Sequence, residues 1–376
     1  MTFGVYIHYP YCARHCPYCD FNVAVTETVP HVAYRDAVLA ELKVRAKAYS
    51  DRPAAASIYF GGGTPGMWPA QYVGEVIAAV EARFGLVEQA EITVEFNPED
   101  ARGEHLAALR SYGVNRLSLG VQSLDDERLA FLGRKHRAED VERAVAYARQ
   151  AGFKNLSLDL IHGMVGQTLV EATADIARAA SLGPEHISTY QLTIERQTPF
   201  GARQRRGETL IVDEPHLLAM FEGVRAALRA HGYQPYEISS AARADHISRH
   251  NTLYWTGAEF LGLGAGAHGF RRQGQGGLRY ENARSPSRYM AAALAGQPAM
   301  TFCDQIQPAD LLDELIMTGL RMDRGIQVTP DMRRRYGPRS QELIRLGLLS
   351  ETDGYWAATE RGRVILDSVV LQLVSV

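Results

Sequence analysis

Three of the four cysteines in the chain, Cys12, Cys16 and Cys19, are spaced Cys-x3-Cys-x2-Cys near the N-terminus. Thiolates are soft ligands that select iron–sulfur clusters, zinc or Cu(I). A short loop with three of them can wrap one face of a cubane cluster and give one thiolate to each of three irons. The fourth iron then has no protein ligand. We therefore expect a 4Fe–4S cluster whose open iron can bind a small molecule.

Two other interpretations of these thiols are weaker. A structural zinc site is closed and tetrahedral, and His8 or His15 could supply a fourth ligand, but no second pair of ligands follows at zinc-finger spacing. A disulfide is disfavoured because the crowded cysteines are odd in number and no secretory signal precedes them.

The composition describes an ordinary globular protein. The formal net charge of −3 over 376 residues gives no reason to expect a nucleic-acid partner. No segment approaches the roughly 18 unbroken apolar residues of a membrane span. The N-terminus runs directly into an apparent strand, without a signal-peptide pattern. We expect a cytoplasmic protein with no transmembrane segment.

Strands and helices alternate through the first half of the chain. Short apolar strands such as residues 57–60 and 156–160 alternate with amphipathic helices such as residues 30–49. Six successive β-then-α units predict an α/β fold with a parallel sheet, arranged as a barrel or partial barrel.

The pattern changes after Glu195. We expect an α/β extension over residues 196–305, with a loop at 198–209, a strand near Tyr236 and a flexible Gly/Gln stretch at 271–277. Residues 306–376 predict a small helical cap of winged-helix type that ends in one helix over 360–373. Its role as a lid is favoured over nucleic-acid binding. Cys303 is expected to be a buried small hydrophobe.

Polar residues recur at the ends of the predicted strands, where α/β barrels place their functional groups. Glycines let backbone groups approach a ligand closely, and a carboxylate in an apolar strand is costly unless it is paired. We expect these residues to share one site: Gly61, Gly62, Gly63, Thr64, Glu95, Gln122 and Asp159. Gly264-x-Gly266-x-x-Gly269 fits a dinucleotide-binding pattern, but the required strand–helix–acidic context is missing.

These motifs together resemble the HemN/HemW branch of the radical S-adenosylmethionine (radical SAM) superfamily. The resemblance implies a partial (β/α)6 barrel over residues 1–195, a 4Fe–4S cluster and bound SAM. In this branch an aromatic at the position of Tyr6 stacks near SAM, and the Gly-Gly-Gly-Thr-Pro element contacts its amino group. Glu95, Gln122, Arg134 and Asp159 match further SAM positions.

Two features separate the subgroups of this branch. Dehydrogenases of the HemN type carry a fourth cysteine where this chain has Phe21, and they have a longer N-terminal arm. Phe21 itself is expected among the cofactor-binding residues. His250 begins a His-Asn-x-x-Tyr-Trp element that is associated with heme in HemW-like proteins. A neutral imidazole is an ordinary heme ligand. The alternative is a structural, hydrogen-bonded histidine under an aromatic cluster.

The resemblance thus favours a HemW-like heme chaperone that passes heme to acceptor hemoproteins, with a respiratory chain as one source of acceptors. A membrane-associated acceptor and a dimer both stay open. It assigns no catalytic residue. The rival is a radical SAM enzyme, either a coproporphyrinogen III dehydrogenase or a HemN-like methyltransferase or cyclopropanase.

Overall fold

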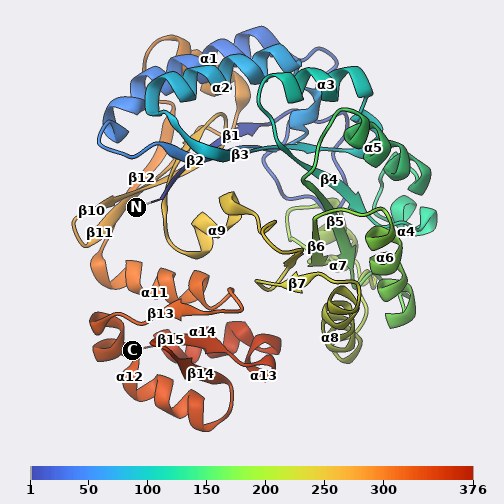
Figure 1. The fold of residues 1–376 in the computed structure, drawn as a ribbon, viewed down its shortest axis with the longest axis vertical. Helices are drawn as coiled ribbons and strands as arrows, with labels where there is room; N and C mark the ends of the chain where they lie inside the picture. Colours follow the sequence, from blue (N-terminus) through green and yellow to red (C-terminus); the bar gives the residue numbers. More distant parts are fainter. Residues whose placement is uncertain (1, 376) are drawn as a thin grey trace.

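The computed structural model describes residues 2–375, which are organised around one large open sheet (Figure 1). Within these residues the sheet has 12 strands in the order β12-β11-β10-β9-β1-β2-β3-β4-β5-β6-β8-β7. Its centre consists of parallel strands that follow one another in chain order: β1 (Phe3–Tyr9), β2 (Ala55–Gly62), β3 (Leu86–Phe96), β4 (Arg116–Gln122), β5 (Leu156–His162) and β6 (His186–Gln191). The expected α/β fold with a partial barrel is confirmed.

Helices cover the outer face of this sheet (Figure 1). They are α1 (His31–Arg45), α2 (Ala70–Phe84), α3 (Gly103–Ser111), α4 (Asp126–Phe131), α5 (Ala138–Gln150) and α6 (Leu169–Ser181), with short 3-10 turns η1 (Ala46–Tyr49), η2 (Pro65–Met67) and η3 (Pro98–Asp100). Helix α6 begins with a capping box. The Thr168 hydroxyl accepts a bond from the Glu171 amide (3.2 Å), and the Glu171 carboxylate accepts one from the Thr168 amide (2.7 Å). Such reciprocal bonds fix where a helix begins.

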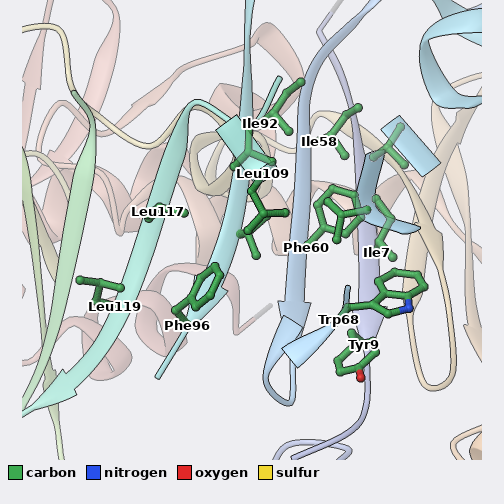
Figure 2. Packing of buried hydrophobic residues seen from close by; sticks show 14 of the residues in the cluster. Ile7, Tyr9, Ile58, Phe60, Trp68, Ile92, Phe96, Leu109, Leu117 and Leu119 are labelled. Atoms are coloured by element: carbon green, nitrogen blue, oxygen red, sulfur yellow. The ribbon is translucent and has the colours of Figure 1, made fainter. Parts of the chain in front are cut away.

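The main hydrophobic core lies between the sheet and these helices (Figure 2). The neighbouring strands β1 to β4 contribute Ile7, Ile58, Ile92 and Leu117, and each of these side chains is at most 5% exposed. Trp68 packs beside them from the segment after β2. Because side chains alternate along a strand, the intervening residues must face the concave side of the sheet.

That concave side is polar. Arg116 on β4 is only 1% exposed, and Ser157 on β5 is fully buried and bonds His186 Nδ1 at 2.8 Å. Helix α9 (Arg249–Trp255) contacts β1 and β2 from this side (Figure 1). The polar side chains therefore lie on the concave side of the sheet. A site can form there from the ends of the strands and the loops that follow them.

The extension adds strands to both edges of the parallel sheet. Strand β9 pairs in parallel with β1, whereas β10 to β12 continue antiparallel, and β8 and β7 continue from β6. Its other elements are α7 (Pro199–Arg205), α8 (Glu214–Ala230), β7 (Gln234–Pro235), β8 (Ser240–Ala242), β9 (Glu259–Leu263), β10 (His268–Gln273), β11 (Gly276–Asn282), α10 (Pro286–Leu294) and β12 (Met300–Ile306).

Several local expectations for this extension were wrong. Residues 198–209, expected to be a loop, contain α7, whose first turn is capped by the Thr198 hydroxyl accepting from the Gly201 amide. The stretch 271–277 is part of the ordered β10–β11 hairpin. The strand expected near Tyr236, by contrast, is confirmed as β7, which ends at Pro235. Cys303 is exposed because β12 is an edge strand with its middle facing solvent.

The C-terminal residues form a module with its own apolar cluster around Trp356. It consists of α11 (Pro308–Gly319), β13 (Ile326–Gln327), α12 (Pro330–Arg345), β14 (Leu349–Thr352), β15 (Tyr355–Ala358), α13 (Glu360–Val364) and α14 (Leu366–Val374). The single last helix expected from the sequence is interrupted at Ile365, whose φ and ψ of −118° and 37° are not helical. The domain boundaries at 195 and 305 stay predictions.

Between residues 2 and 375, no helix is both long and apolar enough to cross a membrane.

Candidate functional site

The three thiols lie on the loop that joins the carboxyl end of β1 to α1. Backbone hydrogen bonds close this loop, from the Cys12 amide to the Ala24 carbonyl (3.1 Å) and from the Ala24 amide to the Pro10 carbonyl (2.7 Å). A third bond runs from the Phe200 amide on α7 to the Pro17 carbonyl at 2.9 Å. The loop is therefore a fixed part of the fold.

The free thiols of Cys12, Cys16 and Cys19 are all partly buried. Burial raises the pKa of Cys12, and it raises the pKa of Cys19 to about 11. In the part of the chain that the structure describes, no three His, Cys, Asp or Glu side chains are arranged to hold one metal ion. A cubane cluster asks for a different arrangement, with each thiolate on its own iron.

A chain of hydrogen bonds connects the thiols to the ends of the neighbouring strands. The Thr64 hydroxyl donates to Cys12 Sγ (3.3 Å) and accepts a bond from Asn97 Nδ2 (3.0 Å). Arg134 Nη2 donates to Asn97 Oδ1 (2.7 Å) and to the Gly120 carbonyl (2.9 Å), while Nη1 approaches Cys16 Sγ at 3.8 Å. Donors directed at sulfur stabilise thiolates.

Arg134 also carries a donor that is not used within the protein. Its Nε is buried and has no hydrogen-bond partner among residues 2–375. A buried unpaired donor is costly, so this atom is suited to an anionic group from a ligand.

Glu95 lies at the end of β3, where its carboxylate accepts bonds from the Tyr59 hydroxyl (2.7 Å) and the Gly62 amide (3.2 Å). Loss of solvent around this carboxyl raises its pKa to about 7. Gly62 has a φ of +114°, and a Cβ there would lie 2.5 Å from the His8 ring. Only glycine allows the backbone to approach Glu95 in this way.

Asp159 and Gln122 complete the strand-end group. Asp159 on β5 accepts bonds from the hydroxyls of Ser118 (2.8 Å) and Ser157 (3.1 Å), and burial raises its pKa. Gln122 follows an irregularity in the β4–β5 pairing and has a φ of +65°. Such a conformation is strained for a residue with a side chain, and strain of this kind is concentrated at functional sites.

The thiols and the strand ends line one cavity with a volume of about 340 Å³, which we call the cluster cavity. Most residues predicted for the site reach it: Cys12, Cys16, Cys19, Phe21, Gly62, Gly63, Thr64, Glu95, Gln122, Arg134 and Asp159. Gly61, Tyr6 and His250 are not among its lining residues. Soft thiols beside carboxylates, an amide and an unpaired guanidinium donor fit a cluster with a bound amino acid derivative.

A second cavity of about 530 Å³, the outer cavity, adjoins the first and shares Asp20, Phe21, Val23, Gly62 and Glu95 with it. Tyr6 lies here, with its hydroxyl 3.0 Å from His8 Nδ1. Tyr254 of the His-Asn-x-x-Tyr-Trp element also lines this cavity.

His250 is 1% exposed and lines neither cavity. Its Nδ1 bonds the Ser57 hydroxyl (2.8 Å) and its Nε2 the Tyr254 hydroxyl (2.9 Å). The ring stacks on Tyr59, with centroids 4.9 Å apart, and burial lowers its pKa to about 3. In this conformation neither ring nitrogen is free to bind iron.

Asn97 and Tyr190 are two of the lining residues that sequence reasoning missed. Asn97 connects Thr64 to Arg134, and its position two residues after Glu95, at the end of the same strand, could have indicated it. Tyr190 lines the cluster cavity from the end of β6. The alternation of β6 would have placed it on the concave face together with Ser188.

Comparison with known proteins agrees with this geometry. The family model "Radical SAM superfamily" matches residues 6–178, and the model "HemN C-terminal domain" matches residues 306–365. A solved structure of coproporphyrinogen III oxidase (HemN) from Escherichia coli, described as a radical SAM enzyme, superposes with a TM-score of 0.82. It is 22% identical and covers 100% of this chain and 90% of its own. The fold and the loop define a radical SAM protein.

In sequence, the chain is more similar to proteins named heme chaperone HemW than to this coproporphyrinogen III oxidase. Heme chaperone HemW from Escherichia coli is 35% identical over 98% of this chain and 97% of its own length. HemW from Bacillus subtilis is 32% identical over 97% of both chains. Radical S-adenosyl methionine domain-containing protein 1 from mouse mitochondria is 34% identical over 98% of this chain and 87% of its own. The chain belongs to the HemW family within the HemN/HemW branch of the radical SAM superfamily.

Proposed function

We propose that this protein is a heme chaperone, which holds a 4Fe–4S cluster and SAM in the cluster cavity and carries heme as cargo. The observation that carries the proposal is the similarity, over nearly the whole chain, to proteins named heme chaperone HemW. Radical SAM proteins as a class imply the cluster and SAM.

In this proposal Cys12, Cys16 and Cys19 bind the cluster, and the Thr64 and Arg134 donors stabilise two of the thiolates. When bound, a reduced cluster supplies an electron that can cleave the sulfonium of SAM. The Cys12 and Cys16 sulfurs lie beside polar hydrogen-bond donors, which support the negative charge of thiolate ligands.

The same proposal assigns SAM to the strand ends. Glu95 and the Gly62–Gly63–Thr64 backbone would bind its ammonium group, and the free Arg134 Nε its carboxylate. Asp159 and Gln122 would bind ribose hydroxyls. Tyr6, which lies in the outer cavity, would reach SAM only from that side.

Heme and an acceptor hemoprotein are the proposed partners, and a respiratory chain is one source of such acceptors. A cytoplasmic location and a dimer stay predictions. The rival function is that of a coproporphyrinogen III dehydrogenase. Phe21 disfavours it, because this residue stands where that enzyme type carries a fourth cysteine. Phe21 is 63% exposed and lines both cavities. A HemN-like methyltransferase or cyclopropanase is the other alternative.

A heme-transfer assay tests this proposal. Anaerobically reconstituted protein is loaded with one equivalent of heme and mixed with an apo-hemoprotein such as apomyoglobin. We expect the acceptor to gain heme more quickly than from serum albumin used as a passive carrier. The same preparation, with SAM and a reductant, should leave coproporphyrinogen III unchanged. Steady formation of protoporphyrinogen would favour the dehydrogenase instead.

A further inference from the structure

Helix α9 carries the His-Asn-x-x-Tyr-Trp element, and both ring nitrogens of its His250 are already bonded. Nδ1 bonds the hydroxyl of Ser57, which belongs to β2, at 2.8 Å. Nε2 bonds the hydroxyl of Tyr254 at 2.9 Å, and the Tyr254 ring meets Phe260 of β9 edge-on with centroids 4.7 Å apart. Because the sheet holds both hydroxyls in place, a metal can reach His250 only after α9 moves.

The C-terminal module holds the carboxyl end of α9 (Figure 1). The guanidinium carbon of Arg321 lies 4.5 Å from the centroid of the Trp255 ring, and Trp255 is the last residue of α9. Two residues later, Gly257 has a φ of +61°, and a Cβ there would overlap Leu315 Cδ2 of α11. Glycine therefore lets α11 pack directly against the backbone that follows α9.

The same module also reaches the amino end of α9. The Ile238 amide donates to the Arg321 carbonyl (3.1 Å), and the Asp323 amide donates to the Tyr236 carbonyl (2.9 Å). The Tyr236 hydroxyl in turn accepts a bond from the amide of Ser248 (3.3 Å), which is the N-cap residue of α9. Both ends of α9 are therefore connected to residues 321–323, which we call the latch segment.

A buried ion pair fixes the latch segment. Arg225 of α8 is 6% exposed, and its Nη2 donates to both carboxylate oxygens of Asp323, at 3.0 Å and 2.8 Å. Its Nη1 donates to the Glu237 carbonyl at 3.0 Å. Breaking a buried, hydrogen-bonded ion pair is costly, so this pair defines one closed arrangement of the module.

Other polar groups at this contact are left unsatisfied. Nε1 of Trp255 and Nε of Arg321 are buried and have no hydrogen-bond partner among residues 2–375. Unpaired buried donors destabilise the closed arrangement, because water would satisfy them after opening. A contact that is held by one strong pair and opposed by unpaired donors suits an element with two arrangements.

We propose that the C-terminal module is a latch on α9 that controls the access of heme iron to His250. In the closed arrangement Ser57 and Tyr254 occupy the imidazole. When the latch segment separates from residues 236–238, α9 can move and one ring nitrogen becomes free. Ligation is then a coordinate bond from a neutral imidazole to iron, with no change in oxidation state. This inference rests on the proposed chaperone function and concerns its regulation, because reclosing replaces iron by a hydroxyl and favours release of heme.

A disulfide across the latch tests this proposal. Glu237 and Met322 form an antiparallel bridge, in which Cα atoms are about 4.5–5.5 Å apart, and a disulfide can span this distance. The variant Glu237→Cys/Met322→Cys, in a Cys303→Ala background, is reconstituted with its cluster and cross-linked anaerobically with oxidised glutathione. A thiol count verifies the cross-link, and near-ultraviolet circular dichroism verifies the fold. Hemin titrations compare this form with the same sample after reduction by a phosphine.

We expect the cross-linked form to bind hemin more weakly than the reduced form, by about tenfold or more, because only the closed arrangement is accessible. Its ferric absorption and electron paramagnetic resonance spectra should lack histidine ligation, and reduction should restore both properties. Equal affinity and equal ligation in the two forms would overturn the latch while leaving the chaperone function in place.

Two further variants should loosen the latch. Arg321→Ala removes the contact with Trp255, and Leu315→Ala removes the packing on Gly257. Each should tighten heme binding about threefold to fivefold and slow the transfer of heme to apomyoglobin. Arg335→Ala is the matched control and should equal the wild type, since Arg335 pairs with Asp313 of the same module at 3.3 Å.

A lack of tightening in both loosening variants would also overturn the latch. If either variant fails to fold, the cross-linked protein still decides the question, because its two forms have the same sequence. Failure of the wild-type protein to bind about one heme per chain would overturn the function itself, and the latch with it.

Discussion

The two adjoining cavities share part of the parallel sheet and of the cysteine loop, but they differ in the other elements that line them. The cluster cavity is lined by strand ends of the parallel sheet, and its polar groups are interlinked, as in the chain from Cys12 through Thr64 and Asn97 to Arg134. The outer cavity is lined by residues of the parallel strands β1 to β3 and also by residues of the added strands β9 to β11, namely Phe260, His268 and Glu281. They meet at Phe21 and Glu95.

This difference separates what the radical SAM core supplies from what the extension adds. A preorganised network of donors and acceptors costs little to arrange when a charged ligand binds, which suits a resident cofactor. The following changes should affect one cavity and spare the other.

The largest expected effect is on the cluster. Cys16→Ala should abolish the 4Fe–4S cluster, because the remaining two thiols of the loop cannot hold three irons. Iron and sulfide analysis after anaerobic reconstitution should give about four of each in the wild type. The exposed Cys303 on β12 provides the control, since Cys303→Ala should keep the full cluster. Heme binding by Cys16→Ala should persist; its loss would mean that heme binding depends on the cluster.

The next largest effect is on SAM. Asp159→Ala removes a carboxylate that lies among Ser118 and Ser157, and it should weaken SAM binding by about 2 kcal/mol, or about 30-fold. Equilibrium binding to the reconstituted protein measures this. The absorbance of the cluster and the affinity for heme should stay the same. Asp213→Asn, at the exposed start of α8, should bind SAM normally. Equal affinity in both variants would make Asp159 a structural residue.

Glu95 should give a pH-dependent stability. Its pKa is raised from 4.5 to about 7, so the folded protein binds more protons than the unfolded chain between these values. The stability from this group is therefore present below pH 4.5 and is lost as the pH rises to about 7. Urea unfolding of the apoproteins measures the free energy of unfolding of Glu95→Gln minus that of the wild type. This difference should be more favourable to the variant at pH 8 than at pH 5. A difference that is independent of pH would contradict the raised pKa.

The smallest effect concerns strained backbone. Gln122→Gly should relieve a φ of +65° and raise the free energy of unfolding by up to about 1 kcal/mol, while SAM binding weakens. Gln89→Gly is a matched control, because Gln89 has a φ of +57° and is exposed at the far end of β3. Both changes should stabilise, and only the first should affect SAM. Unchanged SAM binding in Gln122→Gly would remove Gln122 from the site.

Much of the cluster cavity could be predicted from the sequence. The cysteine spacing is local, and the polar positions Glu95, Gln122 and Asp159 recur at strand ends, so the parallel sheet brings them to one edge. The β/α alternation of the first half likewise determines the order of the central strands.

The outer cavity could not be predicted in this way. It depends on β9 pairing with β1 across more than half of the chain, and no local pattern encodes that contact. The His-Asn-x-x-Tyr-Trp motif predicts His250 as a heme ligand, but only the fold shows that the hydroxyls of Ser57 and Tyr254 bond both of its ring nitrogens. The turns of α7 and the β10–β11 hairpin were missed because glycine and arginine composition hides short ordered elements.

The most direct test of whether heme and SAM occupy separate sites is a heme titration of the reconstituted protein with and without saturating SAM. We predict about one heme per chain in both conditions, with similar affinity and with the cluster absorbance retained. Displacement of heme by SAM in a competitive manner would show that both ligands occupy one cavity, and it would contradict this account.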